Sequence, residues 1–163
     1  MNPIFRNHDI SMKTKFRALK AYVWSVLLYG CEYWTLTEDL KKKLEAAEMW
    51  FIRRMLRISW TERKSNDAVL DDAGIKRSLI KTIRKRQLQF LGHLNRNKSL
   101  EHLVLTGKIE GKRSPGRQRT KYLNSLNKWA TKNELDNNRF LRLSEDRDEW
   151  RAMITDVCLR PGT

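Results

Sequence analysis

This sequence of 163 residues has very little cysteine and no long apolar run. Cys31 and Cys158 are its two cysteines, and neither belongs to a CxxC motif or has a histidine at metal-ligand spacing. We therefore expect neither a disulfide framework nor a zinc site, and no cofactor. No apolar stretch approaches the ~20 residues of a membrane-spanning helix, and the start, MNPIFRNHD, lacks the apolar centre of a signal peptide. We expect an intracellular protein, in the nucleus or the cytoplasm, that binds no membrane.

Acidic residues are scarce in the middle of the chain. Residues 73–133 hold 16 lysines and arginines but 2 acidic residues, whereas residues 1–72 hold 13 and 10 and residues 134–163 hold 5 and 7. Most of the formal net charge of +15 therefore lies in the middle third. This concentration favours a defined cationic face, for which RNA or DNA is a natural partner, over a solvated charge run without a ligand.

Apolar residues at spacings of three and four predict an all-α fold, a bundle of about five to six helices with one basic loop. Capping residues mark most of the helix ends. The expected helices run from Ser11 to Gly30, from Thr37 to about Ile58, over 66–73 between Ser65 and Gly74, over 75–97, over 120–132, and onward from Ser144. Residues 98–110 are compatible with a short helix or with a short hairpin across Thr106-Gly107.

Apolar side chains are assigned to the core by the same spacings. In the first helix the stripe includes Val26, and residues 31–36 are expected to form an extended connector with Tyr33 and Trp34 packed inward. The second helix is expected to bury Leu40, Leu44, Ala47, Phe51, Met55 and Ile58. Five tryptophans are assigned to the core, Trp24, Trp34, Trp50, Trp129 and Trp150, whereas Trp60 lies in a polar loop.

The helix expected over 75–97 separates its apolar residues from an arc of cations. At 100° per residue, Arg77, Lys81, Arg84, Lys85 and Arg96 fall away from the leucine stripe, together with Gly92. Gly92 either allows a sugar-phosphate backbone to approach closely or relieves crowding against a neighbouring helix. His93 either contacts a base or phosphate or is half-buried packing.

The segment GKRSPGRQRTKYL, residues 111–123, is a basic loop that leads into a helix. Its cations are Lys112, Arg113, Arg117, Arg119 and Lys121, which surround Pro115-Gly116. Such a loop has too little apolar surface to fold on itself. We expect the loop and the 75–97 helix together to hold nucleic-acid phosphates without reading the base sequence.

Six stretches resemble the C-terminal region of the endonuclease-reverse transcriptase of non-LTR (LINE-type) retrotransposons. They are LLYGCEYWTLT (27–37), LEAAEMWFIRRMLRI (44–58), SNDAVLDDAGI (65–75), IRKRQLQFLGHLNR (83–96), GKRSPGRQRTKYL (111–123) and DRDEWRAMI (146–154). They occur in the family's order and cover about residues 10 to 155. The resemblance implies a thumb-like helical region over 1–74 and a basic helical extension over 75–163, in one continuous unit that helps to hold template and target.

The sequence departs from that family at the catalytic residues. Polymerisation there needs an aromatic-x-Asp-Asp turn and a further aspartate to hold two metal ions. The adjacent pair here, Asp71-Asp72, follows Val-Leu and ends a short helix, so we interpret it as solvated charge. The residues of an endonuclease domain are missing as well. We therefore expect no catalytic residue, no metal site, and no DNA synthesis or cleavage by this chain alone.

Two functions follow from these observations. The first is a truncated C-terminal portion of a retrotransposon reverse transcriptase, an RNA-directed DNA polymerase, that acts as a sequence-independent RNA- or DNA-binding helical module. The alternative is a non-enzymatic helical protein whose aromatic stripe within residues 12–58 binds another protein, the missing polymerase palm or a second copy of itself. Salt-sensitive binding to nucleic acid favours the first, and self-association without nucleic acid favours the second.

Overall fold

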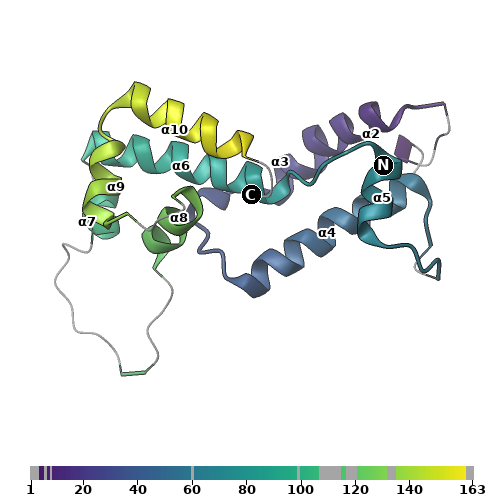
Figure 1. The fold of residues 1–163 in the computed structure, drawn as a ribbon, viewed down its shortest axis with the longest axis horizontal. Coiled ribbons are helices and arrows are strands. Elements are labelled where there is room, and N and C mark those ends of the chain that lie inside the picture. The colour runs from purple at the N-terminus through teal and green to yellow at the C-terminus, as the bar shows by residue number, and fades with distance from the viewer. Residues whose placement is uncertain are drawn as a thin grey trace. The chain divides into compact units, whose positions relative to one another are not determined.

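The computed structural model describes residues 4–5, 7, 9–59, 61–98, 100–106, 115–116, 121–131 and 135–160. Within these ranges the chain is mainly helical and contains no strand (Figure 1), which confirms the all-α prediction. The structure has more helices than the five to six predicted. In place of a hairpin, the described part of 98–110 contains helix α7, Leu100–Thr106. No helix in the described ranges is long and apolar enough to cross a membrane.

The chain divides into two compact units. The first unit comprises Met1–Tyr29 and Glu38–Ile80, and the second comprises Gly30–Thr37 and Lys81–Thr163. The first contains α2 (Met12–Ala18), the π-helical segment η1 (Leu19–Val23), α3 (Trp24–Leu27), α4 (Glu38–Leu56) and α5 (Asn66–Ala73). The second contains the 3-10 turn η2 (Cys31–Tyr33), nearly all of α6 (Leu79–Asn97), α7, α8 (Tyr122–Ala130), α9 (Asn137–Leu143) and α10 (Arg147–Leu159).

The predicted first helix is present as α2, η1 and α3 in succession. Ser11 caps it as expected, since its hydroxyl accepts a hydrogen bond from the backbone N–H of Thr14. Gly30 follows with φ +65°, a conformation that suits glycine. The assignment of Val26 to the core was wrong, because 77% of this residue is exposed.

Helix α4 begins where predicted, but its buried face matches the predicted stripe only in part. Met49, Ile52 and Met55 are buried, whereas Leu40 and Trp50 are 43% and 44% exposed, so the core assignments of those two were wrong. The rest of the predicted stripe, Leu44, Ala47, Phe51 and Ile58, is half-buried. The predicted stripe also left out Glu48, which is 1% exposed and lies on the same face as Ile52 and Met55.

Glu48 holds the start of α6 within the first unit. One oxygen, Oε1, accepts hydrogen bonds from the backbone N–H groups of Ser78 (2.9 Å) and Leu79 (3.1 Å). These N–H groups lie at a helix N-terminus, where they have no intrahelical acceptor. Burial raises the pKa of the Glu48 carboxyl, against the opposing effect of these two bonds. The contact explains why α6 begins at Leu79 and not at Ile75 as predicted.

Helix α5 matches its prediction. The Ser65 hydroxyl accepts from the N–H of Ala68, and Gly74 ends the helix with φ +61°. The preceding loop is tied to α4 by the buried Arg53, whose guanidinium donates to the Lys64 carbonyl and the Asn66 side chain. The start of α5 is therefore stabilised both by its local cap and by a long-range contact from α4.

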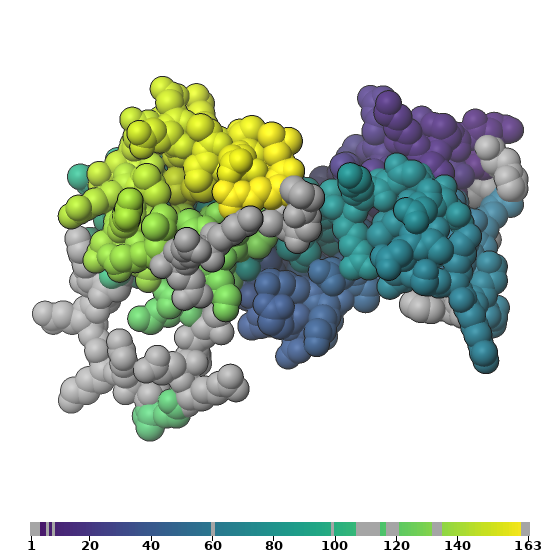
Figure 2. Space-filling view, viewed as in Figure 1, coloured from purple at the N-terminus to yellow at the C-terminus, as the bar shows by residue number. Residues whose placement is uncertain are grey.

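The core of the second unit forms around α6. It consists of Leu88, Leu91, Leu123, Leu126, Ala130, Phe140, Trp150 and Ile154. Helix α10 lies alongside α6 (Figure 1), and the indole N–H of Trp150 donates to the Leu88 carbonyl at 2.9 Å. The ring of Phe140 meets the Trp150 ring edge-on, with centroids 5.3 Å apart. Helices α9 and α10 form much of the visible face of this unit in Figure 2.

Two features at the C-terminal end differ from the prediction. Helix α9 lies between the last two predicted helices, where no helix was predicted, and it contains the fully buried Phe140. The cap of α10 is Asp146 and not Ser144, since the Asp146 carboxylate accepts from the N–H groups of Asp148 and Glu149. These two hydrogen bonds lower the pKa of Asp146, and the bond from Glu149 has the larger effect. Ser144 is buried instead, and its hydroxyl accepts from Asn95.

In the connector of residues 31–36, predicted to be extended, Cys31–Tyr33 forms the 3-10 turn η2, whereas Trp34 has the extended conformation. Its carbonyls are held by side chains of the second unit: Gln87 donates to the Cys31 and Trp34 carbonyls, and the Tyr122 hydroxyl donates to the Glu32 carbonyl. Tyr33 was expected to pack inward, but it is 67% exposed. Trp34 is half-buried.

Candidate nucleic-acid interface

The exposed face of α6 carries a short polar stripe. Lys85, Gln89 and His93 are all exposed and lie four residues apart, so they follow one another along one side of the helix. The half-buried Arg96 is next to them on the same face. We refer to Lys85, Gln89 and His93 as the α6 stripe. Of its three residues Lys85 belongs to the predicted cationic arc, and His93 was predicted separately as a possible contact.

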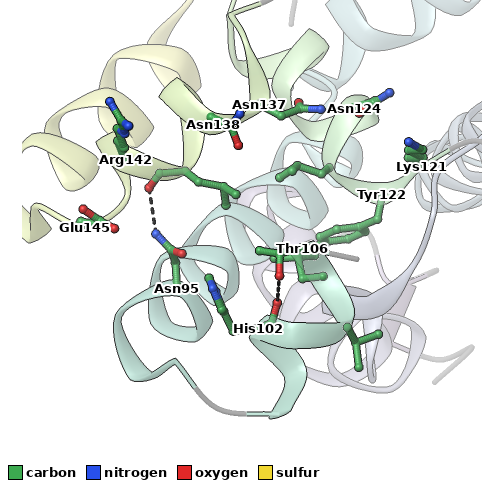
Figure 3. A pocket seen from close by; sticks show the side chains of 14 residues that line it. Asn95, His102, Thr106, Lys121, Tyr122, Asn124, Asn137, Asn138, Arg142 and Glu145 are labelled. Carbon is green, nitrogen blue, oxygen red and sulfur yellow. Dashed lines mark hydrogen bonds between the residues drawn. The ribbon is translucent and has the colours of Figure 1, made fainter. Parts of the chain in front are cut away.

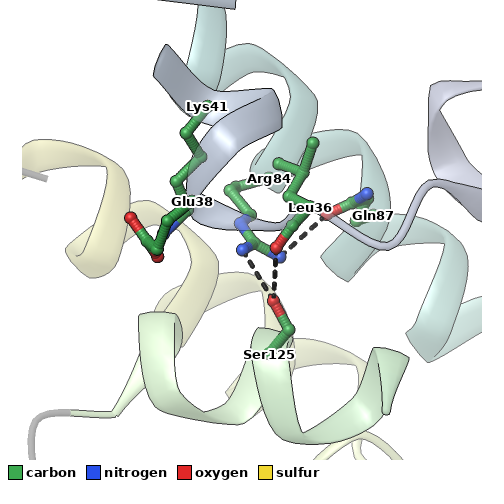
Figure 4. Close-up of polar contacts among 6 residues, drawn as sticks. All are labelled: Leu36, Glu38, Lys41, Arg84, Gln87 and Ser125. Atoms are coloured by element: carbon green, nitrogen blue, oxygen red, sulfur yellow. Dashed lines mark hydrogen bonds and ion pairs between the residues drawn. The ribbon is translucent and has the colours of Figure 1, made fainter. Parts of the chain in front are cut away.

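Arg84, predicted to lie on the same arc, is buried in the second unit. It is 1% exposed, and its guanidinium donates to Gln87 Oε1 at 3.2 Å and to Ser125 Oγ at 2.9 Å (Figure 4). Arg84 lies one helical turn before Leu88, so it shares the buried side of the helix. A buried guanidinium needs polar partners, and Ser125 of α8 is one of them. Its assignment to a phosphate-binding surface is therefore corrected.

Gly92 is also on the buried side. A Cβ atom at this position would lie 2.5 Å from Nε1 and 2.6 Å from Cδ1 of Trp150. Trp150 cannot move aside easily, because it is 2% exposed and its Nε1 is engaged with the Leu88 carbonyl. Of the two interpretations of Gly92, close helix packing is the one that the structure supports, and the approach of a phosphate backbone is excluded by the indole.

Three other predicted cations have hydrogen bonds or ion pairs inside their own unit. Lys81 Nζ donates to the Arg160 carbonyl at 2.8 Å, and Arg96 Nη1 donates to the Ser144 carbonyl at 2.7 Å. Arg77 lies before α6, in the first unit, with its guanidinium 3.5 Å from the Glu45 carboxylate. Lys81 therefore connects α6 to the C-terminal end of α10, and Arg96 connects α6 to the end of α9.

Lys81 and Lys85 also affect the thiol of Cys158. Burial raises the pKa of this thiol, and the positive charges of Lys85 and Lys81 act in the opposite direction. Cys31, by contrast, is fully buried in the connector, and burial together with the Glu32 carboxylate raises its pKa, while Arg86 lowers it. Since the pKa of each thiol is raised, neither cysteine shows the lowered pKa of a reactive or metal-binding thiolate.

The remaining predicted residues fall into two groups. His93 is exposed, with Nε2 3.0 Å from Nδ2 of Asn97, so the half-buried interpretation of this histidine was wrong. Lys121 is exposed at the N-cap position of α8. Lys112, Arg113, Arg117 and Arg119 lie outside the described residues. Pro115 and Gly116 between them are exposed.

An aromatic pair beside the α6 stripe was missed by the sequence analysis. The exposed ring of Tyr33 meets the Phe90 ring at a centroid distance of 4.8 Å. Phe90 lies four residues after Arg86, on the side of α6 next to His93. Exposed aromatic rings near cations are the usual platform for nucleic-acid bases. Both aromatic residues are visible in the sequence. Tyr33 was expected to be buried because its segment is rich in strand-forming residues.

The adjacent aspartates of the sequence lie on the surface of α5. Asp71 and Asp72 are exposed on α5, and the Asp72 carboxylate pairs with Lys64. Within the described residues, no group of three or more His, Cys, Asp or Glu side chains is placed to hold a metal ion.

Comparison with known proteins finds a distant relative. In an alignment of 151 residues that covers 87% of the chain, the sequence is 26% identical to an uncharacterised transposon-derived protein of Caenorhabditis elegans. The chain spans 54% of the length of that protein. No family model matches the sequence, and no solved structure matches it either. The likeness is consistent with a transposon-related origin.

Proposed function

We propose that this chain is a helical module that binds RNA or DNA through phosphate contacts and derives from the C-terminal region of a retrotransposon reverse transcriptase. The observation that carries the proposal is the exposed α6 stripe, which begins with Lys85 and adjoins two further surface cations, Lys81 and Arg96. Lys121 adds an exposed cation at the start of α8. All of these residues belong to residues 73–133, which contain 16 lysines and arginines and 2 acidic residues.

The evolutionary part of the proposal rests on two supports. The first is the set of six stretches that resemble the LINE-type protein, and the second is the likeness to a transposon-derived protein of Caenorhabditis elegans. The chemical part follows from the charge pattern. Each lysine or arginine that neutralises a phosphate releases counterions, so affinity falls as salt rises. Such contacts position a backbone and do not read bases. We propose no catalysis by this chain alone.

Fluorescence anisotropy with three labelled 20-mers tests the proposal. The probes are single-stranded RNA, duplex DNA and an RNA-DNA hybrid, each titrated with the full chain at 50 and 200 mM salt. We expect binding to all three, weakened at least tenfold by the higher salt. A Lys85→Glu/Lys121→Glu variant should bind more weakly than a Lys13→Glu/Lys43→Glu control, which makes the same charge change at exposed positions of the first unit. Absence of salt-dependent binding would refute the proposal.

A second function, self-association, is favoured by an exposed apolar strip on the first unit. Tyr22, Val26 and Tyr29 are 65%, 77% and 87% exposed at spacings of four and three. No charged residue occurs between Lys20 and Glu32, so the strip is uncharged and is suited to a second copy of itself. Sedimentation between 1 and 100 μM without nucleic acid distinguishes the two functions. A monomer throughout, unchanged by Tyr22→Ser/Val26→Ser, excludes self-association.

A further inference from the structure

The second unit contains a cavity of about 740 Å³. Its walls come from the end of α6, helix α7, the start of α8, and α9 with the turn that follows it (Figure 3). A volume of this size lies in the range of small-molecule sites, ~300–1,000 Å³. The polar side chains that line it include His102, Lys121, Asn124, Asn138, Arg142 and Glu145.

Several polar groups of the cavity wall are not used by the fold. The carboxamide of Asn138 and the side chains of Arg142 and Glu145 are exposed and form no hydrogen bond or ion pair within the described residues. Others are committed: Asn95 donates to the Leu141 carbonyl, and Asn137 donates to Asn124 Oδ1. The cavity therefore combines fixed polar groups that shape it with a free amide, a free guanidinium and a free carboxylate.

Two rings contribute flat surfaces to the same wall. The Tyr122 ring is held in place because its hydroxyl donates to the Glu32 carbonyl at 2.8 Å. The imidazole of His102 has no such restraint, since its Nδ1 is buried without a hydrogen-bond partner among the described residues. One ring is thus fixed by a hydrogen bond, and the other has a ring nitrogen whose hydrogen bond a ligand could supply. Lys121 and Arg142 give the wall two positive charges against the one negative charge of Glu145.

We propose that this cavity takes one unpaired nucleobase of a single-stranded RNA or DNA, an inference that rests on the proposed function and adds a ligand preference to it. An amide and a carboxylate match the mixed donors and acceptors of a base edge, and aromatic rings stack on its face. Lys121 and Arg142 then contact the phosphates on either side of that base. In a duplex the base edges are paired and stacked, so duplexes bind through their phosphates alone.

The test compares strands that have the same phosphates with and without bases. A labelled 12-mer single strand is titrated against an abasic 12-mer of equal length, with a duplex as the third probe. We expect the base-bearing strand to bind about tenfold more tightly than the abasic strand, the effect of one stacked base. Asn138→Leu, which removes a donor and an acceptor at an exposed position without changing charge, should reduce this ratio at least threefold and leave abasic binding unchanged.

Two neighbouring arginines of α9 supply a matched control. Arg139 and Arg142 are both exposed, but Arg142 lines the cavity and Arg139 does not. Arg142→Ala should therefore weaken single-strand binding more than Arg139→Ala does. Tyr33→Ser tests the competing location, the aromatic pair beside the α6 stripe, and should reduce the ratio less than Asn138→Leu does.

The outcomes separate this inference from the proposed function. Equal, salt-sensitive affinities for base-bearing and abasic strands overturn the cavity proposal and leave phosphate binding intact. A ratio that is lost in Tyr33→Ser and kept in Asn138→Leu also overturns it, because the base is then bound elsewhere. No binding of any probe refutes the proposed function and, with it, this inference.

Discussion

The two sides of helix α6 both carry basic residues, but those on one side are buried and those on the other are exposed. On one side Arg84 and Gly92 are buried against α8 and α10, where the guanidinium holds Ser125 and the glycine makes room for Trp150. On the other side Lys85, Gln89 and His93 are exposed. Arg84 and Lys85 are adjacent in sequence, yet one stabilises the second unit and the other is available to a polyanion. A basic helix therefore cannot be treated as a uniform binding surface.

The largest expected effect comes from truncating the buried cation. Arg84→Ala removes a fully buried long side chain and leaves Ser125 and Gln87 without their donor, so we expect a loss of about 2–5 kcal/mol in unfolding free energy, as for other buried truncations. Lys85→Ala should change it by no more than about 0.5 kcal/mol. Chemical denaturation followed by circular dichroism measures both. Equal effects at the two positions would remove the distinction between the faces.

A smaller loss is expected from the glycine. Gly92→Ala places a methyl group against the immobile indole of Trp150, and overpacking of this kind costs about 1–3 kcal/mol. Gln89→Ala, on the exposed side of the same helix, is the control and should be close to neutral. The quenching of tryptophan fluorescence should also change in Gly92→Ala alone. A neutral Gly92→Ala would show that α10 does not pack on α6 as described.

The smallest effect concerns pH and the cap of α10, the helix that covers the buried side of α6. The pKa of Asp146 is lowered in the folded state, so its stabilising contribution is complete above the ordinary aspartate pKa of about 4 and is lost as pH falls through the folded value. Asp146→Asn keeps a capping side chain but does not titrate. Thermal unfolding between pH 7 and 2.5 should show a shallower decline at the acid end for Asp146→Asn. Parallel curves would contradict this assignment of the cap.

Local signals in the sequence were sufficient for some elements. Helix α5 was predicted with both its ends because Ser65 and Gly74 act on their immediate neighbours. The start of α6 was not, because it depends on Glu48, 30 residues earlier. Helix α9 was missed because its single buried aromatic residue, Phe140, produces only a weak helical periodicity of apolar residues. Its position is fixed by packing against Trp150.

The candidate site was predictable to a similar extent. The cation excess pointed to residues 73–133, and of the site residues predicted there Lys85, His93 and Lys121 are exposed in the structure. A helical wheel that sorts residues by charge could not place Arg84 in the core, because Ser125 comes from a helix 41 residues away. A helical wheel could not predict the cavity either, because the walls of the cavity come from four separate segments.

The central claim is that the exposed side of α6 contacts phosphates, and the salt dependence of binding tests it most directly. The dissociation constant for a single-stranded 20-mer is measured from 50 to 300 mM salt for the wild type, Lys85→Glu and the control Lys43→Glu. We predict a steep wild-type slope of log affinity against log salt that becomes shallower by about one for Lys85→Glu and is unchanged for Lys43→Glu. Equal slopes in all three proteins would contradict the claim.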